Sequence, residues 1–412
     1  MNRRTLPLAI SALPALIAFA ASCATDAAPR PEANVRDSAG VEIVENSGSL
    51  PLNGGGWSIG LEPDLAIGSV EGDTTYQFFG VAGAHRTADG RIAVVNAGSR
   101  EVRIYDAQGT FVRSLGRPGE GPEEFGMPVL GGAVDDTLVV VDRAHHRISM
   151  VHPDVGFVRL ARVDDDVGGY LNPSGTFGNG QVVFGGAFDM RRIGELKDGM
   201  NRAHTFYRSC NPDGSMAADF GNKSGAEFFI RSLEGRGPES RPALFPFGKM
   251  PLATVSSNYF YFGSGDRYEI EGYDPLGKLV RLVRLERQAT PVTEEDRSRY
   301  IEDTVSEVED ENETRRIRQN LSTLPVPDVF PPYAGLATDA LGHLWVQDYP
   351  RPGDEIPVWT IFDSRGVLSG RVTIPDNVSI LEIGEDYLLG LYRDELGVEY
   401  VHVYSVERPG GG

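Results

Sequence analysis

Residues Gly90–Gly116, GRIAVVNAGSREVRIYDAQGTFVRSLG, contain the pattern that decides the fold. An apolar run from Ile92 is followed by a short break, an alternating run from Val102, and an Asp-x-x-Gly turn at Asp106 that leads into a third run. Alternation of apolar and polar side chains is typical of a half-buried strand, and Asp and Gly favour tight turns. The stretch therefore predicts three consecutive strands joined by short turns.

The same unit recurs along the chain. Further copies begin at Asp136 (DTLVVVDRAHHRISMVHPDVGFVRLARV), Gly180 (GQVVFGGAFD, continued by HTFYRSCNPDGSMAADFG from His204), Asn258 (NYFYFGSGDRYEIEGYDPLGKLVRLVRL), His343 (HLWVQDYPRPGDEIPVWTIFDSRGVLSGRVTI) and Asp386 (DYLLGLYRDELGVEYVHVYSVE). One such unit cannot bury its apolar faces alone, so the units must stack. Four-stranded units stacked around an axis give an all-β, six-bladed β-propeller, expected here over residues 41–408.

The N-terminal part of this region is expected to close the ring. The sixth copy ends at Glu407, which leaves no room for an outer strand. The stretch from Leu65, LAIGSVEGDTTYQFFG, is similar to RSLGRPGEGPEEFGMP from Arg113, which follows the second turn of the first copy. We therefore expect an N-terminal strand to complete the last blade, which would remove free sheet edges.

Two strings carry a resemblance to a known family. VVNAGSREVRIYD and VVDRAHHRISMV resemble NHL-type repeats, and GRPGEGPEEF is similar to the Gly-Pro-Glu loop of bacterial six-bladed propeller lipoproteins. The resemblance covers roughly residues 60 to 407 and implies a propeller fold and export. It implies no single chemistry, because propellers of this type include protein-binding, carbohydrate-binding and catalytic members.

Net charge and the N-terminal residues indicate which partners and which cellular location to expect. The formal charge of -20 over 412 residues argues against nucleic acid and anionic lipid as partners. Residues 1–23 have the basic start and short apolar run of an export signal, and LIAFAASC resembles a lipobox that would lipidate Cys23. Cleavage without lipidation is the alternative. Residues 24–40 are then a flexible tether, and a monomer in the periplasm or on the outer membrane, attached only through the lipid, is expected.

Repeat alignment places polar residues together at one mouth of the expected channel. They follow equivalent strands in several copies, and carboxylates with guanidinium groups can orient a polar ligand. The residues expected there are Asn96, Arg100, Asp142, His145, Arg147, Asp266, Arg267, Asp348 and Arg351. Tyr105 and Tyr349 flank them. The alternatives are turn-capping Asx hydrogen bonds and salt bridges between blades.

No cofactor is required by the sequence, although calcium is a possibility. Asn96, Asp142 and Asp348 offer the oxygen ligands that calcium prefers, in a layout similar to that of calcium-dependent lactonase propellers. The histidines show no zinc spacing, since the adjacent His145 and His146 would point to opposite faces of a strand.

Three other features have structural interpretations. Cys210 has no patterned base beside it and is expected to be a buried thiol. The loop Gly116–Phe125 lacks the following helix of a phosphate cradle and is expected to connect two blades. Thr293–Asn320 is expected to be one helical insertion, begun by a capping box of Thr293 and Asp296, with Arg315, Arg316 and Arg318 near its end.

The sequence favours a non-enzymatic module that binds a protein or a small polar ligand in the bacterial envelope. No nucleophile, base and orienting acid form a recognisable set. A calcium-dependent hydrolase or lyase of lactonase type is the first alternative, and a structural assembly partner of the envelope is the second.

Overall fold

The computed structural model describes residues 32–169, 171–185, 197–230, 242–306, 308–354 and 356–409. The expected export signal, Cys23 and the first part of the tether lie outside these residues. In the part of the chain that is described, no helix is both long and apolar enough to cross a membrane.

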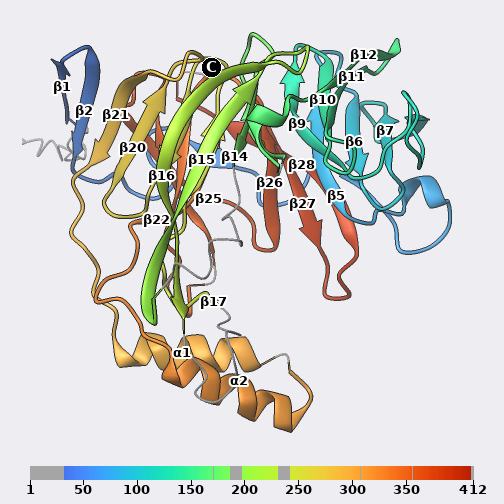
Figure 1. Cartoon of the computed structure of the whole chain (residues 1–412). Helices are drawn as coiled ribbons and strands as arrows, with labels where there is room; N and C mark the ends of the chain where they lie inside the picture. Colours follow the sequence, from blue (N-terminus) through green and yellow to red (C-terminus); the bar gives the residue numbers. More distant parts are fainter. Residues whose placement is uncertain are drawn as a thin grey trace, which may run out of the picture. The chain divides into compact units, whose positions relative to one another are not determined.

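The described chain is mostly β-structure arranged in six sheets, which are named here by the order of their first strands (Figure 1). The first sheet contains β5 (Val81–Arg86), β6 (Ile92–Asn96), β7 (Glu101–Tyr105) and β8 (Phe111–Leu115). The second contains β9 (Pro128–Val134), β10 (Thr137–Asp142), β11 (Arg147–His152) and β12 (Gly156–Arg162). The third contains β13 (Asn172–Thr176), β14 (Val182–Gly185), β15 (Gly199–Cys210), β16 (Met216–Ile230) and β17 (Pro242–Ala243).

The remaining three sheets follow the same plan. The fourth contains β18 (Leu252–Val255), β19 (Phe260–Gly263), β20 (Glu269–Tyr273) and β21 (Leu279–Leu285), extended by β2 (Val41–Ser47) and β1 (Glu32–Ser38). The fifth contains β22 (Tyr333–Thr338), β23 (Leu344–Asp348), β24 (Val358–Phe362) and β25 (Leu368–Thr373). The sixth contains β26 (Val378–Ile383), β27 (Tyr387–Arg393), β28 (Glu399–Glu407) and β3 (Ser58–Ile59), and β4 (Leu65–Ile67) also pairs with β28.

Each copy of the sequence repeat lies in a different sheet, and the sheets stack through their first strands. β5 contacts β9 and β26, β9 contacts β13, β13 contacts β18, and β18 contacts β22. All six first strands line a central cavity of about 1070 Å³. Several four-stranded antiparallel sheets that surround one cavity are consistent with a propeller.

Side-chain hydrogen bonds join neighbouring first strands. Thr176 Oγ1 donates to the carbonyl of Gly131 at 2.8 Å, and Thr338 Oγ1 donates to the carbonyl of Val255 at 2.9 Å. Between β5 and β26, the Nδ1 atom of His85 lies 2.6 Å from Glu382 Oε2. These contacts fix the sheets to one another near the cavity.

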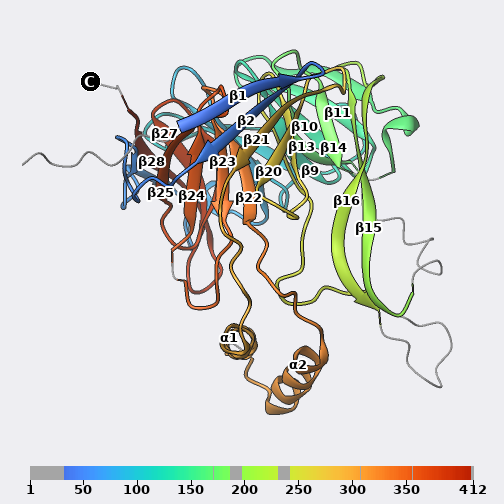
Figure 2. The same cartoon turned by 90° about the vertical axis from the view of Figure 1, so that its left-hand side faces the viewer.

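The N-terminal strands pair with two different sheets. β4 pairs antiparallel with β28, as the similarity of the Leu65 segment to the Arg113 segment predicts. Glu32–Ser38, in the stretch expected to be a tether, instead forms β1, whose hairpin with β2 lies along β21 (Figure 2). The pairing of β2 with β21 is parallel and matches Val44 with Val283, both fully buried. Burial of this apolar pair holds β2 against β21, and β1 is attached through its hairpin with β2.

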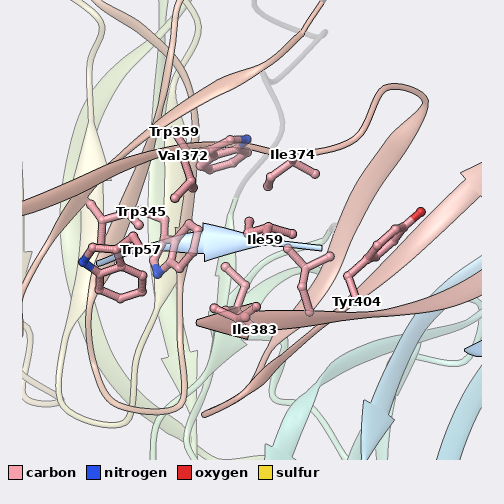
Figure 3. Packing of buried hydrophobic residues seen from close by; sticks show 11 residues of the cluster. Trp57, Ile59, Trp345, Trp359, Val372, Ile374, Ile383 and Tyr404 are labelled. Atoms are coloured by element: carbon pink, nitrogen blue, oxygen red, sulfur yellow. The ribbon is translucent and has the colours of Figure 1, made fainter. Parts of the chain in front are cut away.

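A core cluster packs the residues before β4 against the fifth and sixth sheets (Figure 3). Trp57 is 2% exposed, and its ring lies edge-on to Trp345 at a centroid distance of 5.5 Å. Ile59 of β3 and Tyr404 of β28 belong to the same cluster. Aromatic pairs in this geometry add stability beyond the apolar area that they bury.

The insertion between β21 and β22 consists of two helices, where the sequence predicts one. α1 (Glu294–Val305) begins with the expected capping box of Thr293 and Asp296. α2 (Glu311–Thr323) has its own N-cap, because Asp310 accepts a hydrogen bond from the Glu313 amide at 2.7 Å. Arg315, Arg316 and Arg318 therefore lie inside α2 and are absent from its last turn, contrary to expectation.

Candidate functional site

A cavity of about 410 Å³ lies at the junction of the fourth and fifth sheets. Its walls come from the β19–β20 turn, the two links to the helical insertion, the β23–β24 loop and β25. Four of the nine residues expected at the channel mouth line it: Asp266, Arg267, Asp348 and Arg351. Tyr349, expected beside them, lines it too. This volume falls in the range of small-molecule sites.

Asp348 pairs with two arginines in the lining of this junction cavity. Its Oδ1 accepts from Arg287 Nη1 at 2.8 Å and its Oδ2 from Arg371 Nη2 at 2.9 Å. Thr360 Oγ1 donates to Oδ1 at 2.9 Å. The Asp348 side chain is only 17% exposed, so water screens these charges weakly. One carboxylate therefore faces two guanidinium groups, which leaves one positive charge in excess.

Two buried polar atoms of lining residues have no hydrogen-bond partner among the described residues. They are Tyr268 Oη and Arg371 Nε. Tyr268 is 6% exposed, and burial raises the pKa of its hydroxyl, so the group stays a neutral donor. A buried donor without an acceptor costs about 1–3 kcal/mol, and such a group calls for a bound water, ion or ligand.

Aromatic rings form the apolar part of the cavity. The Phe330 ring lies 5.6 Å from the Tyr349 ring and 4.8 Å from Phe247. Burial raises the pKa of Tyr349 to about 12, so this ring stays neutral. The Arg287 guanidinium lies 5.2 Å from the Tyr268 ring centroid, a cation–π distance.

The other expected residues of this cavity hold neighbouring segments in place. Asp266 accepts from Arg202 Nη1 at 2.6 Å and Lys249 Nζ at 3.0 Å. Burial opposes ionisation of Asp266, but these cations keep its pKa below the usual range. Arg351 donates to Asp296 of α1 at 2.9 Å and stacks over Phe330, which joins the insertion to the fifth sheet. Arg267 pairs with Glu269 and is largely exposed.

The five expected residues of the first and second sheets do not line this cavity. Asn96 accepts from the Phe79 amide at 2.9 Å and donates to Ser99 at 2.8 Å. Arg100 is exposed, with a φ of 59° in the β6–β7 turn. These contacts match the turn-capping alternative for Asn96.

In the second sheet, Asp142 is fully buried and holds the neighbouring loop in place through hydrogen bonds. It accepts from the amides of Gly126 and Met127, from His145 Nδ1 at 2.6 Å, and from Arg147 Nε at 3.2 Å. Burial raises the pKa of Asp142, but these donors outweigh it and the net shift is downward. Arg147 also donates to two carbonyls of the Gly116–Phe125 loop. Asp142 and Arg147 therefore secure their own loop and do not line the junction cavity beside Asp348.

The bonds of Asn96, Asp142 and Asp348 do not form an oxygen cage for calcium. Within the described ranges, no group of three or more His, Cys, Asp or Glu side chains could hold a metal ion. His85 contacts Glu382, His145 contacts Asp142, and His343 contacts Asp339, so these histidines have separate partners. Calcium binding stays a prediction that this geometry does not favour.

Two structural interpretations of the sequence are confirmed. Cys210 is fully buried, and burial raises the pKa of its thiol to about 12. The Gly116–Phe125 loop connects β8 to β9, which belong to different sheets.

Three important lining residues have no direct signal in the sequence. Arg287 lies in the connector after β21, Arg371 lies in the outer strand β25, and Tyr268 follows the flagged Arg267. Arg371 pairs with a residue 23 positions earlier in the chain. Only the pairing of β23, β24 and β25 brings the two together.

Comparisons with known proteins do not identify a family. No family model and no curated protein matches the chain. Solved structures that align with it include an exported-protein candidate of Bacteroides fragilis, at 11% identity and a TM-score of 0.46, covering 89% of this chain and 99% of that one. A DUF4221 member from Bacteroides vulgatus aligns at 8% identity and 0.47, covering 86% and 99%. Virginiamycin B lyase from Staphylococcus aureus aligns at 11% and 0.36, covering 83% and 98%. Similarities this low carry no argument about function.

Proposed function

We propose that this chain is an exported six-bladed β-propeller that binds a small polar ligand without transforming it. Six sheets whose first strands surround one cavity, and the pairing of β4 with β28, support a ring closed by both ends of the propeller. The basic start and apolar run of residues 1–23 support export, and LIAFAASC supports lipidation at Cys23.

The ligand site that we propose is the junction cavity between the fourth and fifth sheets. One observation carries this assignment: two arginines share Asp348 in a cavity that aromatic rings also line, and two buried polar atoms of lining residues have no described hydrogen-bond partner. Binding sites are concave and mostly apolar, with a few convergent polar groups. The junction cavity combines apolar and aromatic lining residues with a few convergent charged groups.

Capture of small molecules from a cell-envelope extract tests this function. Purified protein is mixed with the extract and separated by size exclusion, and retained molecules are identified by mass spectrometry. We expect the wild type to retain a molecule that Arg287→Gln retains at least several-fold less, because Arg287 lines the cavity. Arg365→Gln, in an exposed pair with Asp363, is the matched control. Absence of a retained molecule, or equal retention by wild type and Arg287→Gln, would contradict the proposal.

A further inference from the structure

The charge balance of the junction cavity favours an anion. Arg287 and Arg371 have only Asp348 between them, whereas Asp266 is neutralised by Arg202 and Lys249 from outside the cavity lining. Asp348 is itself mostly buried. A ligand with a negative charge would restore neutrality beside Asp348, and charge-assisted hydrogen bonds to guanidinium groups are among the strongest in proteins.

The buried polar atoms favour an acceptor at the same place. Tyr268 Oη and Arg371 Nε can both donate, and neither makes a full hydrogen bond to a described residue, although the Thr360 side chain lies near the Tyr268 hydroxyl. Tyr268 is more than nine-tenths buried and lines the cavity. A carboxylate has two oxygens that could accept from these donors once the side chains that cover them move aside.

The remaining walls favour an apolar body. The Phe330 and Tyr349 ring centroids lie 5.6 Å apart with the rings tilted. Val329 and Ile356 also line the cavity although they are 38% and 52% exposed. Covering exposed apolar side chains beside an aromatic wall with a flat apolar group removes apolar surface from water, which stabilises the complex.

We infer that the junction cavity binds a small aromatic carboxylate, with its carboxylate near Tyr268 and Arg371 and its ring against Phe330 and Tyr349. This inference rests on the proposed binding function and names the class of ligand for that site.

Paired probes test the class of ligand. Phenylacetate and indole-3-acetate are titrated by calorimetry beside their primary amides, which have the same shape without the charge. We expect at least one carboxylate to bind wild type about tenfold or more tightly than its amide, since hydrogen bonds to charged groups are the stronger ones. Equal affinity of acid and amide, or no binding of either carboxylate, would overturn the inference.

A variant at Tyr268 tests the position of the carboxylate. Tyr268→Phe keeps the ring and removes the unpaired hydroxyl, so the melting temperature without ligand should be unchanged or higher. Affinity for the carboxylate should fall several-fold, whereas Tyr400→Phe, in the sixth sheet, should leave it unchanged. Unchanged affinity in Tyr268→Phe would refute this placement.

Failure of this inference can be separated from failure of the binding function. If extract capture yields a neutral molecule whose retention needs Arg287, the chain binds a ligand but the carboxylate assignment is wrong. If capture yields no molecule, both the binding function and the carboxylate assignment are contradicted.

Discussion

The imidazole Nδ1 of His85 lies 2.6 Å from Glu382 Oε2, and this contact joins the first strand of the first sheet to the first strand of the sixth. The other oxygen of Glu382 accepts from Tyr387. The pair is mostly shielded, with 15% of the His85 side chain and 22% of the Glu382 side chain exposed. The pair therefore links the first sheet to the sixth.

This pair should make stability depend on pH. Burial alone would lower the pKa of His85, but Glu382, with help from Asp136, raises it above the ordinary value of 6.5. The protonated form is therefore favoured by folding, and its contribution is full below about pH 6.5 and is lost as the pH rises through the higher folded-state pKa. We expect His85→Gln to reduce the free energy of unfolding by roughly 1–3 kcal/mol near pH 6 and by less near pH 9.

Urea unfolding at several pH values measures this dependence. The nearby Arg86 and Asp136 also face the pair, so the comparison is between variants and not between absolute stabilities. His152→Gln, whose imidazole lies 3.9 Å from Asp154 at a more exposed site, is the control. An equal effect of His85→Gln at both pH values would contradict the expectation.

Trp57 should be a main stabilising contact between the N-terminal strands and the fifth sheet. Its ring packs edge-on to Trp345 and His343, and the Arg408 guanidinium lies 4.9 Å from it. We expect Trp57→Ala to lower the free energy of unfolding by about 3–5 kcal/mol, as buried aromatic truncations do. Chemical denaturation measures this loss. Phe79→Ala, at a 78% exposed side chain, should change stability little.

Arg351 should restrain the helical insertion. Its guanidinium bonds Asp296 of α1 and lies 5.6 Å from the Phe330 ring. We expect Arg351→Gln to speed thermolysin cleavage within residues 294–323 several-fold, because local opening becomes easier, while the midpoint of global unfolding stays nearly constant. Arg316→Gln, in an exposed pair with Glu313, serves as control. If both variants are cleaved as slowly as wild type, Arg351 does not hold α1.

The lipobox-like string predicts membrane attachment through Cys23. Cys23→Ala should move the protein from the detergent-extracted membrane fraction to the soluble periplasm or the medium, because the lipid chain that would attach it to the membrane is then missing. Fractionation with mass spectrometry of the N-terminal peptide measures this change. A wild-type protein that is fully soluble with an unmodified N-terminus would show that lipidation does not occur.

Some features followed from the sequence because short-range interactions determine them. Period-two alternation within five or six residues is enough to indicate a strand such as β7 or β11, whatever the rest of the chain does. The capping box joins Thr293 and Asp296, three positions apart, and needs only local backbone geometry. Repetition of the local pattern then predicted one sheet for each copy.

The candidate site depended on distances that no local pattern contains. Repeat alignment treated Asp142 and Asp348 as equivalent positions. In the structure, Asp142 is fully buried and bonds its own loop, whereas Asp348 bonds Arg287 in the lining of the junction cavity. The parallel pairing of β2 with β21, which joins Glu42 to Arg281, likewise had no signal near either segment. By itself the sequence determined the strands and turns within the repeat units, since these depend on neighbours along the chain. Only the tertiary structure decided which side chains share a cavity, because that depends on how separate sheets pack and which charges they leave without a partner.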